Sequence, residues 1–61
     1  MPEVIVYAVE GRTPEIKKAL AKDITEAVMK HFSVPAELVM VQIVESSRES
    51  KFRGGVPFSE R

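Results

Sequence analysis

Two apolar runs and one amphipathic segment divide the chain. Residues 4–9 are apolar at every position and rich in β-branched side chains, which predicts a strand that is buried on both faces. Residues 38–45 predict a second strand, with Val39, Val41 and Ile43 on one face. A small domain standing alone does not cover both faces of the first strand, so the pattern already indicates a neighbouring chain.

Residues 14–32, between the two runs, carry apolar side chains at three- and four-residue spacings and predict an amphipathic helix. Thr13 and Pro14 are typical of the N-cap and the first helical position, and Pro35 favours the helix end. His31 falls in the last turn, where a cation suits the helix dipole, so we interpret it as a helix-end residue and not a catalytic one. The apolar positions are Ile16, Ala19, Leu20, Ile24, Ala27, Val28 and Phe32.

Strand, helix and strand in this order predict a βαβ unit of the α/β (α+β) class, with parallel strands and a right-handed crossover. Residues 46–51 form a polar loop, and Gly54-Gly55 between apolar residues predicts a C-terminal hairpin or turn. One helix covers one face of the sheet, which leaves the face with Met40 and Val44 open. Exposed apolar patches of this kind mark interfaces, so we expect subunits to assemble into a larger β-sheet oligomer.

Composition adds limits to this picture. With 61 residues the chain is expected to be a single domain, 1–61, that is marginally stable alone. It has no cysteine and one histidine, so neither disulfides nor a metal site are expected. Self-association is then the remaining way to stabilise so small a domain. Nine basic and nine acidic side chains give zero net charge, which argues against nucleic-acid or membrane partners. The apolar runs are too short to span a bilayer, and we expect a cytoplasmic protein.

Pro2 is the candidate for chemistry. Aminopeptidases remove an initiator methionine when the next residue is as small as proline, and the mature chain would then begin with a secondary amine. An α-amino group titrates near roughly 7.7 to 8.0, and burial or a nearby cation disfavours its protonated form. Such an amine suits general base catalysis. The plainer interpretation is that Pro2 only starts an edge strand, where its missing N–H does no harm.

The chain resembles the 4-oxalocrotonate tautomerase family over essentially its whole length. The features that carry the resemblance are Pro2 behind Met1, Glu10-Gly11-Arg12-Thr13, Pro35, the strand 39–45 and Gly54-Gly55. The resemblance implies a βαβ subunit of the tautomerase superfamily, assembled into a homohexamer that is usually a trimer of dimers.

The resemblance also implies an activity. Members of the family are cofactor-independent isomerases that interconvert enol and keto forms of a small 2-oxo acid such as 2-hydroxymuconate. Pro2 would be the catalytic base and then the acid, and Arg12 would bind a substrate carboxylate through two parallel hydrogen bonds. Lys51, Phe52 and Arg53 lie in the segment that the family places near the active site, and they are further candidates for substrate binding.

Two positions depart from the family pattern. Met40 stands where the best-known members have a second arginine, and Lys51 stands where they have the aromatic wall of the proline pocket, which here moves to Phe52. Arg48, Lys51 and Arg53 could compensate for the missing cation. We therefore expect tautomerase chemistry with a weaker preference for the dicarboxylate muconate than for another 2-oxo acid.

Two alternatives stay open at this point. The chain could be one subunit of a mixed assembly in which a partner chain supplies the missing arginine. It could also be a non-catalytic oligomeric scaffold. Retention of Met1 would favour the scaffold, because the nitrogen of Pro2 would then be an amide without basicity.

Overall fold

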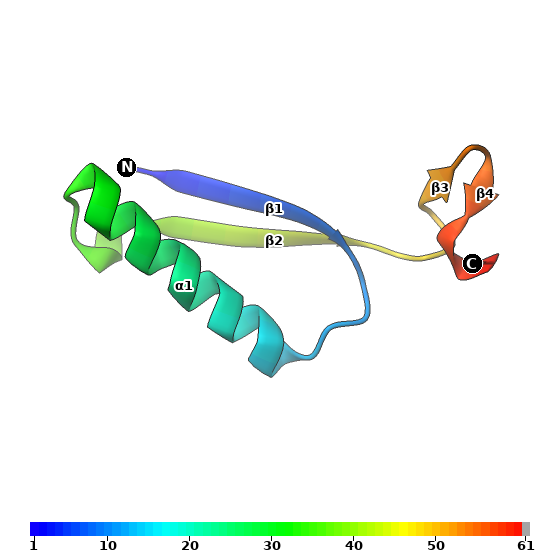
Figure 1. Cartoon of the computed structure of the whole chain (residues 1–61), viewed down its shortest axis with the longest axis horizontal. Coiled ribbons are helices and arrows are strands. Elements are labelled where there is room, and N and C mark those ends of the chain that lie inside the picture. Colours follow the sequence, from blue (N-terminus) through cyan, green and yellow to red (C-terminus); the bar gives the residue numbers. More distant parts are fainter. Residues whose placement is uncertain (61) are drawn as a thin grey trace.

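The computed structural model describes residues 1–60, so residue 61, the last position of the predicted domain 1–61, lies outside the described part. The elements run in the order β1 (Glu3–Val9), α1 (Pro14–Phe32), a 3₁₀ turn η1 (Ala36–Leu38), β2 (Met40–Ser46), β3 (Phe52–Arg53), β4 (Val56–Pro57) and a 3₁₀ turn η2 (Phe58–Glu60). Figure 1 shows β1, β2 and α1 as one body, with the hairpin of β3 and β4 beyond one end of the sheet. The predicted βαβ unit and C-terminal hairpin are confirmed.

β1 and β2 are parallel, and their register places Val4 beside Val41 and Val6 beside Ile43. These four side chains are half-buried on the sheet face that α1 covers, whereas their neighbours along each strand are exposed. The chain alone therefore covers one face of β1, although its sequence is apolar enough for two. No residue within 1–60 is fully buried, which is unusual for a stable domain standing alone.

The other sheet face is the open apolar surface that the alternation predicted. Its large apolar side chains are Ile5, Tyr7, Met40 and Val44, with exposed fractions of 44, 74, 50 and 36%. We call these residues the open sheet face. Patches of this kind on small proteins usually meet a partner.

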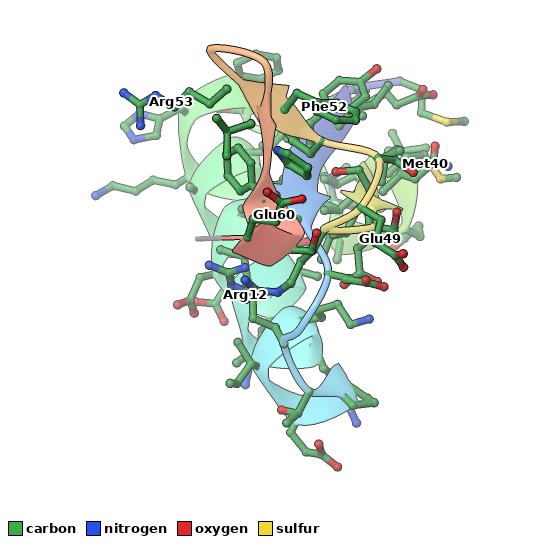
Figure 2. The ribbon with its side chains drawn as sticks, turned by 90° about the vertical axis from the view of Figure 1, so that its right-hand side faces the viewer. Arg12, Met40, Glu49, Phe52, Arg53 and Glu60 are labelled. Carbon is green, nitrogen blue, oxygen red and sulfur yellow. The ribbon has the colours of Figure 1, made fainter. Side chains whose placement is uncertain are left out.

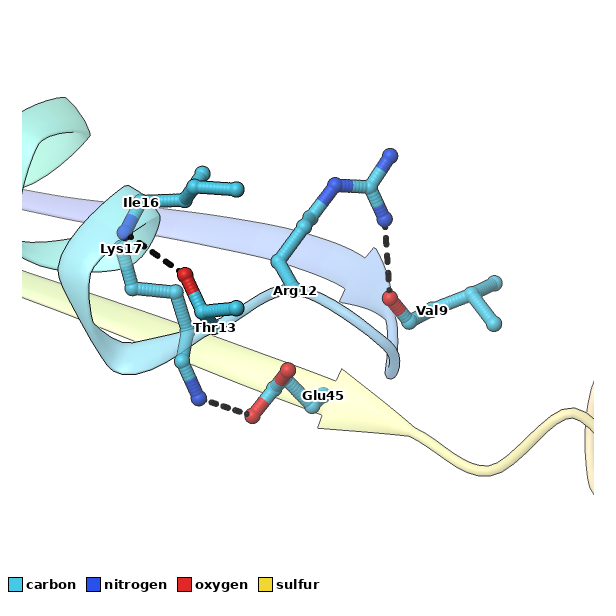
Figure 3. A network of polar contacts seen from close by, with 6 residues as sticks. All are labelled: Val9, Arg12, Thr13, Ile16, Lys17 and Glu45. Carbon is cyan, nitrogen blue, oxygen red and sulfur yellow. Dashed lines mark hydrogen bonds and ion pairs between the residues drawn. The ribbon is translucent and has the colours of Figure 1, made fainter.

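α1 begins and ends at the predicted residues. Thr13 is the N-cap, and its Oγ1 accepts a hydrogen bond from the Ile16 N–H at 3.2 Å, with Pro14 in the first turn (Figure 3). The helix ends at Ser33, which adopts the left-handed conformation with φ of 55°. Pro35 was expected to end the helix, and the chain leaves the helix before that proline exerts its effect.

The apolar stripe of α1 is only partly covered. Ile24 and Val28 are half-buried, whereas Ile16, Leu20 and Phe32 are 54, 42 and 65% exposed. A two-stranded sheet is too narrow to cover the full width of the stripe. Like the open sheet face, the remainder of the stripe is apolar surface that this chain does not bury.

The predicted start of the second strand at residue 38 is wrong. Leu38 belongs to η1, where its N–H donates to the Pro35 carbonyl at 3.1 Å. β2 begins only where the Met40 N–H reaches the Pro2 carbonyl at 3.0 Å. The strand therefore starts where the partner strand starts, a boundary set by pairing across the sheet.

No helix within residues 1–60 is long and apolar enough to cross a membrane.

Candidate active site

Pro2 lies at the start of β1. Its carbonyl accepts the Met40 N–H at 3.0 Å, so the two strands are joined at this point. Pro2 is half-buried, while Met1 in front of it is 83% exposed. The end of the sheet that carries Pro2 therefore also carries Met40, and removal of Met1 would leave the Pro2 nitrogen at this end.

Arg12 lies beyond the other end of the same strand. Gly11 precedes it with φ of 127°, a backbone conformation that favours glycine, and Thr13 follows as the helix N-cap. The Arg12 Nη1 atom donates to the Val9 carbonyl at 3.1 Å (Figure 3). The rest of its guanidinium extends from an exposed turn next to the N-terminal end of α1, where the helix dipole favours an anion.

The whole of β1 separates Pro2 from Arg12. The strand has seven residues, and at about 3.3 Å per residue it spans about 23 Å. A small 2-oxo acid does not reach across that distance. Residues 1–60 also enclose no pocket. If these two residues act on one substrate, they must come from different copies of the chain.

An ion pair joins α1 to β2 at the end of the sheet near Arg12. Lys17 Nζ pairs with Glu45 Oε1 at 2.8 Å, which ties the first turn of α1 to the end of β2 (Figure 3). Both side chains are about one-third exposed, so this ion pair contributes little stability in water. It nevertheless engages one carboxylate oxygen of Glu45.

Lys51, Phe52 and Arg53 lie on the hairpin and just before it. All three are exposed, and Phe52 is 58% exposed. Gly54 and Gly55 form the turn with φ of 60° and 82°, and the hairpin closes on the Phe58 N–H, which donates to the Lys51 carbonyl at 2.8 Å. Figure 2 looks at this end of the molecule and shows Arg12, Phe52 and Arg53 on it.

The predicted site residues therefore fall into two groups. Arg12, Lys51, Phe52 and Arg53 lie at or beyond one end of the sheet, and Pro2 lies at the other end (Figure 1). Met40, where the resemblance led us to look for a second arginine, lies beside Pro2 and away from the basic residues.

Arg48 is a basic residue whose place the sequence did not reveal. It lies in the turn after β2, and its Nη2 atom comes to 3.7 Å from the position that a Cβ atom at Gly11 would occupy. Among the three cations considered as replacements for the missing arginine, Arg48 is the one with this contact to the Arg12 turn. The position of Arg48 in the sequence, two residues after the end of β2, does not predict this contact with Gly11.

Comparison with known proteins gives the family. The family model described as "Tautomerase enzyme" matches residues 2–61. A probable tautomerase of Bradyrhizobium diazoefficiens is 44% identical over 61 residues, which is 100% of this chain and 91% of that protein. The 2-hydroxymuconate tautomerase of Pseudomonas sp. (strain CF600) is 37% identical over 60 residues, covering 98% of this chain and 95% of that protein.

Solved structures agree with the sequence comparison. A crystal structure of a 4-oxalocrotonate tautomerase homologue has a TM-score of 0.93 at 36% identity and covers 100% of this chain and 97% of that chain. The heterohexameric 4-oxalocrotonate tautomerase from Chloroflexus aurantiacus has a TM-score of 0.86 at 30% identity, covering 98% and 97%. Structures similar to this chain thus include oligomeric assemblies. The chain belongs to the 4-oxalocrotonate tautomerase family of the tautomerase superfamily.

Proposed function

We propose that this protein is a cofactor-independent isomerase that interconverts the enol and keto forms of a 2-oxo acid, with Pro2 as the base. The observation that carries the proposal is the place of Pro2, which precedes β1 directly and is the residue at which the family match begins. Without Met1, its nitrogen is a secondary amine at the edge of the sheet. The name of the 2-hydroxymuconate tautomerase relative supports this substrate class.

The reaction needs one group that first takes and then returns a proton. The Pro2 nitrogen removes the hydroxyl proton of the enol, the C–O bond becomes a carbonyl, and the electron pair of the double bond moves to carbon. That carbon then takes a proton from the Pro2 ammonium, so the substrate is isomerised with no net gain or loss. Arg12 holds the carboxylate through charge-assisted hydrogen bonds. No electrons leave the substrate, and no cofactor is required.

A complete site requires more than one chain, and we propose a homohexamer, arranged as a trimer of dimers, in the cytoplasm. The length of β1 between Pro2 and Arg12 supports a shared site. The open sheet face and the exposed part of the α1 stripe supply apolar surface for subunit contacts.

The natural substrate is proposed to differ from the dicarboxylate muconate. Met40 lies beside Pro2 and is 50% exposed, and a methionine side chain neither binds a carboxylate nor polarises a carbonyl. We expect the enol of phenylpyruvate, which has one carboxylate and an apolar ring, to be converted with a higher kcat/KM than 2-hydroxymuconate. Clearly faster ketonisation of 2-hydroxymuconate would refute this preference.

The test of the function is the amine of Pro2. Intact mass of the purified protein shows whether Met1 is absent, and Pro2→Ala replaces the secondary amine without adding bulk. Because a positioned general base contributes about 10² to 10⁴ in rate, we expect kcat/KM to fall by about a hundredfold or more while the oligomer persists. Unchanged turnover in this variant would refute Pro2 as the base, and a wild-type protein without Met1 and without turnover would leave the non-catalytic scaffold as the better account.

A mixed assembly is the second candidate, and the heterohexameric relative from Chloroflexus aurantiacus favours its consideration. In such an assembly another chain would supply the cation that Met40 does not. Size analysis and activity of this chain purified alone decide between the two. A homohexamer that catalyses ketonisation makes a partner chain unnecessary, whereas a chain that does not assemble alone supports the mixed assembly.

A further inference from the structure

Arg48 lies in a turn that is hydrogen-bonded to residues from both halves of the chain, Glu10 and Ser59. Its N–H donates to Glu10 Oε2 at 3.3 Å, and its carbonyl accepts the Ser59 N–H at 3.0 Å. The turn is closed by the Ser50 N–H, which donates to the Ser47 carbonyl at 3.1 Å. The backbone of Arg48 is therefore fastened to the end of β1 on one side and to η2 on the other.

The side chain of Arg48 turns back over Gly11. Its Nη2 atom lies 3.7 Å from the position of a Cβ atom at that glycine, and Arg12 is the next residue in the chain. Two guanidinium groups thus extend from adjoining turns at one end of the sheet. Since like charges repel, this arrangement favours an anion that binds both.

Among residues 1–60, the acidic residues of the same region form no ion pair with these two groups. Within residues 1–60, neither guanidinium forms an ion pair, and the one ion pair joins Lys17 to Glu45. Glu10 accepts the Arg48 backbone N–H and does not pair with the guanidinium. Figure 2 shows Glu49 to the right of Arg12 and Glu60 above Arg12, and neither carboxylate pairs with Arg12 or Arg48. Within the described part of the chain, both guanidinium groups thus lack a carboxylate partner, and Arg12 uses Nη1 on the Val9 carbonyl, which leaves its other N–H groups for a ligand.

We propose that Arg48 is a second carboxylate-binding residue, acting with Arg12 of the same chain on the carboxylate and 2-oxo group at one end of the substrate. This inference rests on the proposed function and narrows its substrate class. In this arrangement both guanidinium groups bind the same end of the substrate. The strand residues around Pro2, in residues 1–6 and 38–42, include no lysine or arginine.

The far end of the substrate is therefore expected to be uncharged. Met40 beside Pro2 suits an apolar group there. Arg48 thus does not restore the specificity of a second arginine at position 40, because it acts at the carboxylate end that Arg12 already binds. The favoured class is a 2-oxo monocarboxylic acid with an apolar or aromatic substituent.

The test measures binding of 3-phenylpropanoate, which has the carboxylate and the ring but cannot tautomerise. Its affinity for the assembled protein is compared among wild type, Arg48→Gln and Lys22→Gln. Lys22 is exposed on α1, so its variant loses the same charge away from the site. Hydrogen bonds to charged groups are worth enough to change affinity about tenfold or more.

We expect Arg48→Gln to weaken 3-phenylpropanoate binding about tenfold or more, and to leave binding of the neutral 3-phenylpropanamide unchanged. Lys22→Gln should bind both ligands as the wild type does. Arg48→Lys keeps the charge but not the two parallel hydrogen bonds, so an intermediate loss is expected. For turnover of the phenylpyruvate enol, KM should rise more than kcat falls.

Equal binding by wild type and Arg48→Gln, or an equal loss in Lys22→Gln, would overturn the role of Arg48. If Arg48→Gln fails to assemble, Arg48→Lys decides, and wild-type affinity in that variant would count against the proposal. Binding of the inert acid does not depend on catalysis. Arg48-dependent binding by a protein without isomerase activity would therefore refute the proposed function alone, and unchanged KM and binding in an active Arg48→Gln enzyme would refute the inference alone.

Discussion

Tyr7 offers a direct test of what covers the open sheet face. It lies beside Val44 in the sheet register and is 74% exposed in the single chain. Ile5 and Met40 belong to the same face and are 44 and 50% exposed. If assembly buries this face, replacing Tyr7 by serine removes the largest apolar contribution to it.

The size of the effect follows from the exposed area. A tyrosine side chain buries roughly 150 to 250 Å² when covered, so the exposed part of Tyr7 corresponds to about 150 Å² available for burial. At about 25 cal/mol per Å² this contributes about 3 to 4 kcal/mol per subunit. The association constant of Tyr7→Ser should therefore fall by about a hundredfold or more for each contact.

Sedimentation equilibrium over a range of protein concentrations measures this change. We expect Tyr7→Ser to dissociate at concentrations where the wild type stays assembled, and its urea midpoint to be lower at the same protein concentration, since dissociation and unfolding are linked. Tyr7→Phe keeps the ring area and serves as the matched control, with assembly close to wild type. Assembly of Tyr7→Ser indistinguishable from wild type would show that this face is not buried between subunits.

Two further predictions concern the turn before α1. Thr13→Ala removes the cap that Ile16 N–H uses, so the free energy of unfolding of the oligomer, measured in urea, should fall by about 1 kcal/mol per subunit; Thr13→Ser, which keeps the hydroxyl, should retain most of it. Gly11→Ala forces a side chain onto a residue with φ of 127°, and we expect a loss of about 1 to 3 kcal/mol together with a higher KM, because Arg12 and Arg48 both adjoin this glycine. Wild-type stability in Gly11→Ala would contradict the backbone argument.

The helix could be predicted from the sequence because its signals are local. Thr13 and Pro14 mark its start within two residues, and Ile24 and Val28 of the predicted stripe lie on the half-buried side, which Ala21 and Met29 outside that stripe also share. The end of the helix and the start of β2 were harder to predict from the sequence. Ser33 ends the helix by adopting a left-handed conformation that serine seldom takes, and Leu38 is held in η1 because the strand begins only at the residue that pairs with β1.

The sequence names candidates for the site, but it does not give their arrangement in space. The resemblance names Pro2 and Arg12 as candidates, and the seven residues of β1 that separate them are the reason why we propose a site shared between chains. The approach of Arg48 to Gly11 could not be predicted, because it depends on contacts between segments that lie far apart in the sequence. Glu10 and Ser59 hold that turn from opposite ends of the chain.

The most direct test of a site shared between chains is complementation. Pro2→Ala and Arg12→Gln are each expected to be nearly inactive as pure oligomers. When the two variants are unfolded together in equal amounts and reassembled, each site draws Pro2 from one chain and Arg12 from another. About a quarter of the sites then hold both native residues.

We therefore predict that the mixed oligomers recover about a quarter of the wild-type activity. The two pure variants, reassembled in the same way, should recover none. Mass spectrometry of intact oligomers verifies that the two chains have mixed. Mixed oligomers that remain as inactive as the pure variants would contradict a site built from Pro2 and Arg12 of different chains.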